Sequence, residues 1–314
     1  MTSTKTEWYF IVNPRAGSGK TLSEWIPAEH ILESLDIPYI TAYTSHKRHA
    51  MALAYDAAAD GFRKIIAVGG DGSIHEVFNG IMKWCDDTGT DPLDFYIGVA
   101  PIGSGNDWIK SLNVPHDVVA VIDLIEAGSY CKMDVVKVCS VGKKVSYMAN
   151  IGGVGFDSHV CKVVNMQKES GKRGKLIYLN ALRFTIFNHK PINVKVIADD
   201  KEVYNGSAYS IALGNGRYSG SGMRQVPLAI MGDGLLDIMV VPRIALHKII
   251  RQIPKLFDGT LIESRDVVFA RCKKLEIIPL DEASNDLIEL DGEIEGRIPL
   301  TIEMDGRQIN AIKG

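Results

Sequence analysis

The sequence predicts an N-terminal α/β domain with a parallel sheet, followed by a β-rich antiparallel domain. In the first half of the chain, apolar runs typical of buried parallel strands alternate with helical patterns. After about Asp134, apolar and polar residues alternate between turn signals, which is typical of antiparallel strands. The length of 314 residues also favours two packed domains over one.

The individual elements follow from the same patterns. The N-terminal strands are expected at Trp8–Val12, Pro38–Tyr43, Lys64–Val68 and Phe95–Ala100, with a helix at Ala50–Ala59. The C-terminal strands are expected at Lys144–Asn150, Ile192–Ala198, Ser207–Leu213, Leu235–Val241, Val267–Ala270, Leu275–Ile278, Asp286–Leu290 and Leu300–Met304. Two helices, Lys175–Phe187 and Leu246–Phe257, interrupt these strands.

The change of pattern places the domain boundary between residues 133 and 137. The first domain then spans residues 1–134 and the second spans 135–314. The sequence leaves open whether the last strands return to the first domain.

Composition and charge exclude several classes of protein. The net charge of −3 argues against a protein that coats nucleic acid, so no nucleic-acid partner is expected. Five cysteines without CxxC spacing indicate neither a disulfide framework nor a zinc ribbon, and a cytoplasmic location is expected. The apolar run before Asn13 is too short for a signal peptide, and no run approaches the roughly 18 apolar residues of a membrane span.

Three of the four N-terminal strands lead into turns of small residues, at Asn13–Lys20, Gly69–Ser73 and Pro101–Asp107. Turns that follow parallel strands lie at the carboxyl ends of those strands, where open sheets bind ligands. Glycine lets backbone N–H groups approach a phosphate, and the N-terminus of a following helix favours an anion. The three turns therefore predict one shared site for a phosphorylated ligand.

The second turn carries an aspartate, Asp71, among its glycines. A carboxylate is electrostatically wrong for holding phosphate alone, so Asp71 indicates a cation, with Mg²⁺ the obvious choice, or a proton to be handled. Ser73 and Glu76 have capping-box spacing, and the apolar residues after them predict a helix.

Two common nucleotide motifs are excluded. The Walker A pattern ending at Lys20 would need glycine at Pro14. The GxGxxG fingerprint is missing as well, because Gly103 and Gly105 are followed by Trp108 where its last glycine would stand.

Together these motifs resemble the diacylglycerol kinase catalytic-domain family, which includes bacterial lipid kinases, sphingosine kinases and ceramide kinases. The resemblance is carried by Asn13-Pro14 with Gly17 and Gly19, GGDGSIHEVFNG at Gly69–Gly80, GSGND at Gly103–Asp107, VPLAIMGDGLLD at Val226–Asp237 and LDGE at Leu290–Glu293. It implies an N-terminal α/β domain related to those of NAD kinase and phosphofructokinase, and a C-terminal β-sandwich-like domain. It also implies transfer of the γ-phosphoryl group of ATP to a lipid hydroxyl, with ATP and lipid meeting between the domains.

The resemblance implies the following ATP contacts: Asn13, Pro14, Gly17, Thr44, Gly69, Gly70, Asp71, Gly72, Ser73, Glu76, Gly103, Ser104 and Asn106. It implies a carboxylate network of Asp71, Asp107 and Asp134 around a catalytic Mg²⁺. From the residues alone, Asp107 could equally be a helix N-terminal acid, and Asp134 a solvated residue at a strand start.

A second Mg²⁺ is implied at the loop that contains Ile230, Asp233 and Leu235, although Asp233-Gly234 is also a common turn dipeptide. For the proton acceptor, the family offers Glu293 or Asp71 as catalytic residue, and Glu293 is the choice made here. His75 follows the second turn and could approach phosphate, although a role in the core is as compatible with the sequence.

A lipid kinase without a spanning helix must reach its substrate at a membrane surface. Two segments combine basic and apolar residues. One leads from Lys168, Lys172, Arg173 and Lys175 into Leu176–Phe187, and the other carries His247, Lys248, Arg251 and Lys255 among Ile249, Ile250, Ile253, Leu256 and Phe257. Peripheral binding at the inner face of the membrane is therefore expected, and the resemblance implies a homodimer. NAD kinase, a sphingoid-base or ceramide kinase, and an inactive nucleotide or lipid sensor remain as alternatives.

Overall fold

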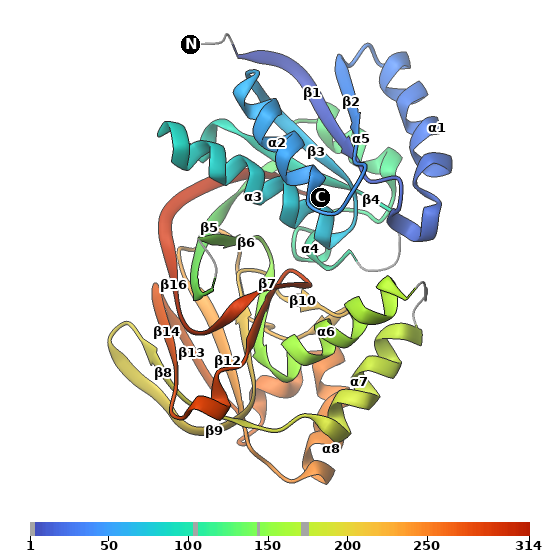
Figure 1. Ribbon diagram of the computed structural model, residues 1–314. Helices are drawn as coiled ribbons and strands as arrows, with labels where there is room; N and C mark the ends of the chain where they lie inside the picture. The colour runs from blue at the N-terminus through green and yellow to red at the C-terminus, as the bar shows by residue number, and fades with distance from the viewer. Residues whose placement is uncertain (1–3, 103–105, 143–144, 171–175) are drawn as a thin grey trace. The chain divides into compact units, whose positions relative to one another are not determined.

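The computed structural model describes residues 4–102, 106–142, 145–170 and 176–314. The chain divides into two compact units (Figure 1). The first consists of residues 1–135 and 306–314, and the second consists of residues 136–305. Each unit is described separately below.

The first unit contains a parallel sheet in the order β4-β3-β1-β2. Its strands are β1 (Lys5–Val12), β2 (Tyr39–Tyr43), β3 (Phe62–Gly69) and β4 (Tyr96–Pro101). The end of the chain returns to this sheet, because Asn310 and Ala311 of β16 (Glu293–Ile312) pair in parallel with Tyr96 and Ile97 of β4.

Helices connect and cover these strands. They are α1 (Thr21–Ser34), α2 (His49–Ala59), α3 (Asp71–Thr88), α4 (Asp107–Ser111) and α5 (Val118–Glu126), with short 3₁₀ turns η1 (Ala16–Gly19) and η2 (Pro92–Asp94). Helix α2 packs closely on α3, since a Cβ added at Gly80 would lie 2.3 Å from the carbonyl oxygen of Met51. Helix α1 packs on α5 (Figure 1).

The strand order contains a topological switch. The chain moves from β1 in one direction to β2, whereas the later connections lead in the opposite direction through β3 to β4. Right-handed crossovers then place α1 on one face of the sheet, and α2 and α3 on the other. The switch therefore lies between β1 and β3, and such a point is where open α/β sheets bind ligands.

The second unit is mostly antiparallel. Its strands are β6 (Ser146–Met148), β7 (Ile151–Gly155), β8 (Ile192–Ala198), β9 (Lys201–Gly214), β12 (Leu236–Pro242), β13 (Val268–Cys272), β14 (Lys274–Pro279) and β15 (Leu287–Leu290), with a separate pair β10 (Tyr218–Ser219) and β11 (Met223–Arg224). Strands β5 (Tyr130–Val141) and β16 pass from one unit to the other. The helical segments are α6 (Phe156–Glu169), α7 (Leu176–Asn188), α8 (Leu246–Asp258), η3 (Thr260–Glu263) and η4 (Glu282–Ser284).

Pairing in the second unit runs round a closed circuit, β7-β9-β8-β14-β16-β15 and back to β7. Closure removes exposed strand edges and encloses the apolar side chains that point inward. The enclosed residues form one buried cluster that includes Val194, Ile211, Ile277, Ile288 and Ile302.

The predicted fold class is confirmed: a parallel α/β unit is followed by a mostly antiparallel β unit. Each predicted strand overlaps an observed one within the described residues, although Lys144 and Lys175, which open two predicted elements, lie outside them. The sequence missed the full length of β16, because Gly296, Pro299 and Gly306 read as breaks. Here Gly296 and Gly306 have positive φ values of 136° and 82°, so the strand continues through conformations that glycine tolerates.

Candidate functional site

The ends of the parallel strands bring several predicted ATP positions together. The N–H of Thr44 donates to the carbonyl of Val12 (2.9 Å), and the N–H of Asn13 donates to the carbonyl of Val68 (3.0 Å). Next along the sheet, the N–H of Ile102 donates to the carbonyl of Gly69 (2.9 Å). Thr44, Asn13 and Gly69 therefore lie beside one another at the carboxyl edge, at the topological switch. Gly103 and Ser104, which follow Ile102, lie outside the described residues.

The first turn is stabilised by its own asparagine. The Asn13 side-chain oxygen accepts from the N–H of Arg15 (3.0 Å), and its carbonyl accepts from the N–H of Ala16 (3.0 Å). Pro14 is half-buried within this turn, and η1 follows it. Gly17 has a φ of 55°, a conformation that glycine adopts without strain.

The second turn is built on close packing. A Cβ added at Gly69 would lie 2.3 Å from the Ser73 hydroxyl oxygen, so a side chain here would push the start of α3 away from β3. Gly70 is the N-cap residue, and its carbonyl accepts from the N–H groups of Ser73 (2.8 Å) and Ile74 (3.2 Å). Gly72 thus falls in the first turn of α3, at the helix end that favours an anion.

The predicted capping box is wrong. Helix α3 already begins at Asp71, so Ser73 lies inside the helix. The Glu76 carboxylate instead accepts from the N–H groups of Arg48 (2.9 Å) and Ala50 (3.1 Å), at the start of α2. Both of its oxygens hold a neighbouring helix N-terminus, which is a structural role that capping-box spacing cannot reveal.

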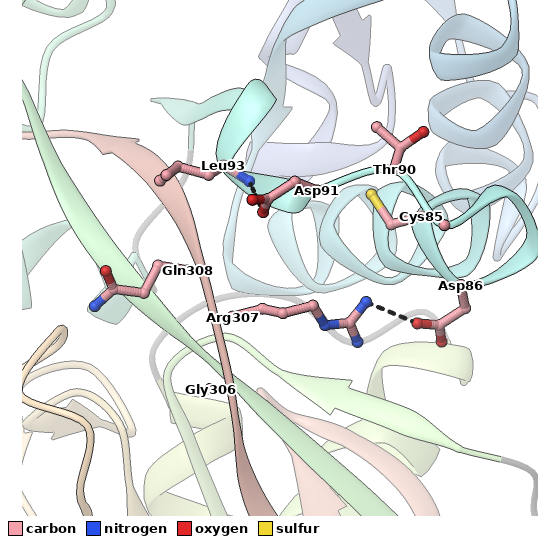
Figure 2. A pocket seen from close by; sticks show the side chains of 9 residues that line it. Cys85, Asp86, Thr90, Asp91, Leu93, Gly306, Arg307 and Gln308 are labelled. Atoms are coloured by element: carbon pink, nitrogen blue, oxygen red, sulfur yellow. Dashed lines mark hydrogen bonds and ion pairs between the residues drawn. The ribbon is translucent and has the colours of Figure 1, made fainter.

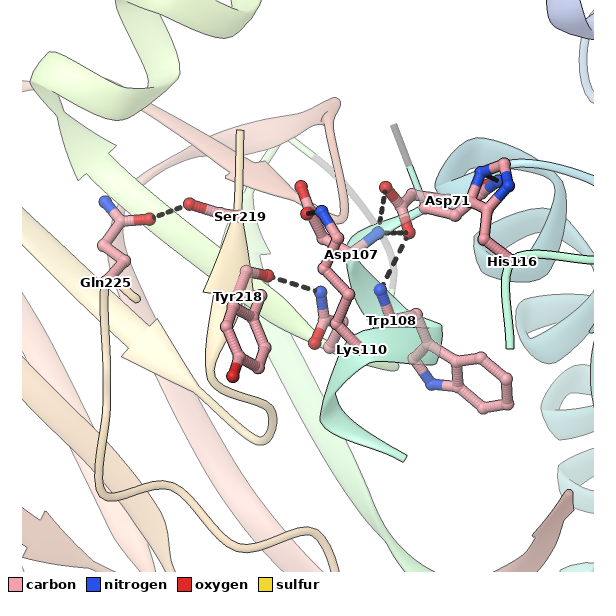
Figure 3. Close-up of polar contacts among 10 residues, drawn as sticks. Asp71, Asp107, Trp108, Lys110, His116, Tyr218, Ser219 and Gln225 are labelled. Atoms are coloured by element: carbon pink, nitrogen blue, oxygen red, sulfur yellow. Dashed lines mark hydrogen bonds and ion pairs between the residues drawn. The ribbon is translucent and has the colours of Figure 1, made fainter. Parts of the chain in front are cut away.

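Asp71 contacts the third turn directly (Figure 3). Its Oδ1 accepts from the N–H groups of Asp107 (2.9 Å) and Trp108 (3.0 Å), and its Oδ2 lies 3.0 Å from the Asp107 nitrogen. The carboxylate that begins α3 therefore caps α4. The Asp107 side chain is 5% exposed and forms an ion pair with Lys110 (2.6 Å).

Asn106, a predicted ATP contact, precedes α4. It is 1% exposed, and its amide nitrogen lies 3.0 Å from Nε2 of His116. Its side-chain oxygen is buried and has no hydrogen-bond partner among the residues that the structure describes. A buried acceptor without a donor is costly, so this oxygen is available to a ligand donor.

Asp134 lies on β5, where its Oδ1 accepts from the side-chain amide of Gln308 on β16 (2.8 Å). Like Asp107 it is buried, with 5% of its surface exposed. Asp71, Asp107 and Asp134 supply hard carboxylate oxygens from three different elements of the first unit. Oxygen is the ligand type that Mg²⁺ prefers. Lys110 pairs with Asp107 (2.6 Å), and backbone N–H groups already donate to both Asp71 oxygens, so a Mg²⁺ ion would have to displace Lys110 and share the Asp71 oxygens with these groups.

The second unit contains the predicted proton acceptor. Leu290 pairs with Glu293, so Asp291 and Gly292 form a two-residue hairpin turn, and both have positive φ (52° and 86°). The Asp291 carboxylate is buried and accepts from the N–H groups of three successive residues: Ala149 (2.9 Å), Asn150 (2.8 Å) and Ile151 (3.1 Å). Glu293, the first residue of β16, is partly exposed. The Asp291 side chain therefore has a structural role, whereas solvent can reach the Glu293 side chain two residues later.

At the predicted second metal loop, an arginine already pairs with the carboxylate. Asp233 Oδ1 accepts from the N–H of Leu235 (3.1 Å), and its Oδ2 forms an ion pair with Arg271. The N–H of Asp233 points to the carbonyl of Ile230 (3.4 Å). The same guanidinium contacts Asp237 (3.2 Å), which is 0% exposed. A Mg²⁺ ion on Asp233 would have to displace Arg271, so this donor set does not fit the metal.

A buried polar network was missed by sequence reasoning. Asp157 on α6 accepts from the Ser210 hydroxyl and from the Gln225 amide (2.6 Å), and Gln225 in turn accepts from the Ser219 hydroxyl (Figure 3). Burial raises the pKa of Asp157, and these hydrogen bonds partly oppose the shift. The residues are far apart in sequence, so no local spacing marks them.

His75 lies in the core, and two further histidines stack near the start of α2. His75 is 2% exposed inside α3, and its carbonyl accepts from the Asn79 amide (2.9 Å), so its placement fits the core role. His46 and His49 stack with their ring centroids 4.7 Å apart at the start of α2.

A pocket of about 560 Å³ lies in the described part of the first unit (Figure 2). It is lined by the C-terminal end of α3, the loop after it and β16, and its Arg307 pairs with Asp86 (2.9 Å). The lining residue Cys85 follows Asp71 by 14 positions, or roughly 21 Å along the helix. None of the predicted site residues lines this cavity.

The chain is similar to several known proteins over most of its length. A curated "Probable lipid kinase YegS-like" from Xanthomonas campestris pv. campestris (strain 8004) is 27% identical over 240 residues, covering 76% of this chain and 74% of the relative. A "Diacylglycerol kinase" from Staphylococcus epidermidis (strain ATCC 12228 / FDA PCI 1200) is 25% identical, covering 92% of this chain and 86% of the relative. The crystal structure of a diacylglycerol kinase from Bacillus anthracis str. Sterne has the same fold, with a TM-score of 0.70, 22% identity, and coverage of 98% of this chain and 97% of that one.

Two family models cover most of the chain. The "Diacylglycerol kinase catalytic domain" matches residues 7–138, and the "YegS C-terminal NAD kinase beta sandwich-like domain" matches residues 150–313. This chain therefore belongs to the diacylglycerol kinase catalytic domain family and carries its YegS-type C-terminal domain.

Proposed function

We propose that this protein is a Mg²⁺-dependent kinase that transfers the γ-phosphoryl group of ATP to the hydroxyl of a lipid alcohol, with diacylglycerol as the first candidate. One observation carries the proposal. The carboxyl edge of the parallel sheet brings Thr44, Asn13 and Gly69 next to one another. The Asp71 carboxylate also connects the second turn to the third, because it accepts from the N–H of Asp107. Names of the relatives support the lipid as acceptor.

Phosphoryl transfer needs positioning and neutralisation of charge more than covalent chemistry. The N-terminus of α3, with Gly70 and Gly72, would bind phosphate oxygens. The buried Asn106 oxygen would accept a donor of the nucleotide. Asp71, Asp107 and Asp134 would hold Mg²⁺, which when bound neutralises phosphate charge.

Glu293 is the better candidate for the group that accepts the hydroxyl proton. Both oxygens of Asp71 already accept backbone hydrogen bonds, which leaves fewer lone pairs to take a proton. Glu293 is partly exposed at the start of β16, beside a turn that Asp291 fixes. A carboxylate so placed could accept the proton as the hydroxyl attacks.

A membrane-bound substrate requires a docking surface, and α8 has the composition for one. No residue of α8 is buried, and Leu246, Ile250 and Phe257 are 41%, 48% and 54% exposed. Lys248 and Arg251 on the same helix are exposed. Helix α7 adds exposed Leu179, Phe184 and Phe187, while Lys172, Arg173 and Lys175 lie outside the described residues. Among the described residues, no helix is long and apolar enough to span a bilayer.

We propose that α8 binds anionic membranes peripherally, at the cytoplasmic face. Vesicle flotation with neutral and anionic lipids tests this surface. We expect flotation with anionic vesicles, and a reduction for the double variant Ile250→Gln/Arg251→Gln. Equal flotation of that variant and the parent would contradict the proposal. The homodimer stays a prediction, to be checked by light scattering.

The kinase proposal is tested by incubating the purified protein with labelled ATP, Mg²⁺ and separate acceptors. The panel contains diacylglycerol, sphingosine, ceramide, undecaprenol and NAD. We expect a phosphorylated lipid, loss of product when Mg²⁺ is chelated, and loss in Glu293→Gln. The exposed Glu282→Gln serves as the matched control and should retain activity. Labelled NADP as the sole product, or ATP binding without any product, would overturn the assignment.

A further inference from the structure

Three side chains outside the predicted kinase residues converge in the second unit. His159 lies on α6, His189 directly follows α7, and Asp286 directly precedes β15. One potential ligand atom from each lies within 4.8 Å of the others. His159 Nε2 is 2.9 Å from Asp286 Oδ1, and the two imidazole centroids are 4.9 Å apart. The cluster therefore combines two imidazoles and a carboxylate from three separate elements.

His189 is oriented by a backbone carbonyl. Its Nε2 lies 3.0 Å from the carbonyl oxygen of Tyr209, which can only accept, so Nε2 carries the hydrogen. The lone pair is then on Nδ1, which is buried and has no hydrogen-bond partner in the described part of the chain. The rings of Phe156 and Tyr209 pack against the imidazole. In a metal-bound histidine, one ring nitrogen usually donates its hydrogen to a carbonyl or carboxylate, and the lone pair of the other nitrogen binds the metal.

Asp286 supplies a second acceptor without a partner. The residue is 9% exposed, and its Oδ1 accepts from the N–H of Leu287 (2.8 Å) as well as contacting His159. Its Oδ2 is buried and has no hydrogen-bond partner within the described ranges. A buried acceptor left unsatisfied destabilises the fold, so two in one cluster need a compensating interaction. A cation would satisfy both at once.

The cluster is also accessible. The His159 side chain is 38% exposed, so one side of the cluster faces solvent while Asp286 closes the other. An ion could enter there, and a water could complete its coordination. These are the features of a three-ligand site with an open position.

We propose that His159, His189 and Asp286 bind a divalent transition-metal ion, with Zn²⁺ the best match. Imidazole and carboxylate ligands suit Zn²⁺, whereas Mg²⁺ prefers oxygen ligands alone. His159 would present Nε2 after its proton moves to Nδ1, and the metal would replace the present hydrogen bond to Asp286. Bonds of about 2 Å place tetrahedral ligand atoms about 3.4 Å apart, so the side chains would close the cluster slightly on binding. The ion would tie α6, the end of α7 and the start of β15 together.

The test measures binding and needs no kinase activity. The full-length protein is stripped with a chelator, then titrated with ZnCl₂ by calorimetry in the presence of excess MgCl₂, and with CoCl₂ by visible absorption. We expect one bound Zn²⁺ and the absorption of tetrahedral Co²⁺. His189→Ala and Asp286→Asn should each weaken Zn²⁺ binding at least about 100-fold.

The stacked pair His46 and His49 provides the matched control. The double variant His46→Ala/His49→Ala removes the other close histidine pair and should leave the affinity unchanged. If His189→Ala fails to fold by circular dichroism, His159→Gln at the exposed side of the cluster decides the question. Absence of stoichiometric binding, binding that survives the cluster variants, or binding that is lost with His46 and His49 would each overturn the site.

Discussion

Asp71 and Asp107 begin neighbouring helices, and the carboxylate of the first caps the helix that begins with the second. Both Asp71 oxygens lie within 3.0 Å of the Asp107 backbone nitrogen, although the residues are 36 positions apart. The negative charge of Asp71 does not suit a phosphate-binding turn, but its carboxylate has a structural partner in the backbone of the third turn. The same contact joins the second glycine-rich turn to the third, beside Asp107.

We predict that Asp71→Asn reduces kinase activity far more than stability. The amide keeps one oxygen for the α4 N–H groups, so the free energy of unfolding should fall by about 1 kcal/mol, as for other lost caps. Loss of the charge should lower kcat at least about 100-fold, because charge neutralisation dominates phosphoryl transfer. Urea denaturation and kcat are measured together. Asp117→Ala removes the cap of α5 and is the control. Equal losses of activity in the two variants would show that Asp71 acts only as a cap.

We predict that Arg271→Gln destabilises the second unit by about 3 kcal/mol or more, because it leaves the buried Asp237 carboxylate unpaired. Burial raises the pKa of Asp237, and Arg271 opposes that shift. Without Arg271 the folded-state pKa rises further, so the deficit should shrink as pH falls and Asp237 becomes protonated. Denaturation curves at several pH values check this, with exposed Arg265→Gln as the control.

The same variant tests the predicted metal role of Ile230, Asp233 and Leu235. If their oxygens can hold Mg²⁺ once the guanidinium is gone, added Mg²⁺ will raise the melting temperature of Arg271→Gln more than that of the parent. Equal shifts in melting temperature would show that these oxygens do not bind Mg²⁺, and that within the described residues Asp233 pairs with Arg271 in place of a metal ion.

The sequence predicts features that depend on neighbouring residues, but it does not predict contacts between residues far apart in the chain. Strand positions and the glycine turns were predictable, because apolar patterns and turn residues are local signals. Partners were not: Glu76 reaches a backbone 28 positions away, and Asp291 reaches one 142 positions away. His159 and Asp286 are 127 positions apart, so no spacing rule joins them. Ser73 and Glu76 show the converse, since their spacing matches a capping box although α3 begins before Ser73 and Glu76 caps α2 instead.

The buried Asp157 carboxylate predicts a pH dependence of stability. Its folded-state pKa is raised above 3.8, mainly by burial, so the stabilising contribution is fully present below about pH 3.8 and is lost as pH rises through the folded pKa. Asp157→Asn keeps the shape and both side-chain partners. We expect its free energy of unfolding, relative to the parent, to increase over that pH range by about 1.4 kcal/mol for each unit of the shift. A pH-independent difference would contradict a carboxylate buried in charged form.

The Asp291-Gly292-Glu293 turn gives a prediction in which two neighbouring carboxylates behave oppositely. Asp291→Asn would turn an NH₂ group toward the N–H groups of Ala149, Asn150 and Ile151, so we expect about 1–3 kcal/mol less stability. Glu293→Gln changes a partly exposed side chain, so its stability should stay within about 0.5 kcal/mol of the parent. Its kcat should nevertheless fall about 100-fold or more if Glu293 accepts the hydroxyl proton. Thermal denaturation and initial rates, measured on both variants, separate the two roles. Full activity in Glu293→Gln would show that Glu293 does not accept the hydroxyl proton. Asp71 would then be the remaining candidate for the base.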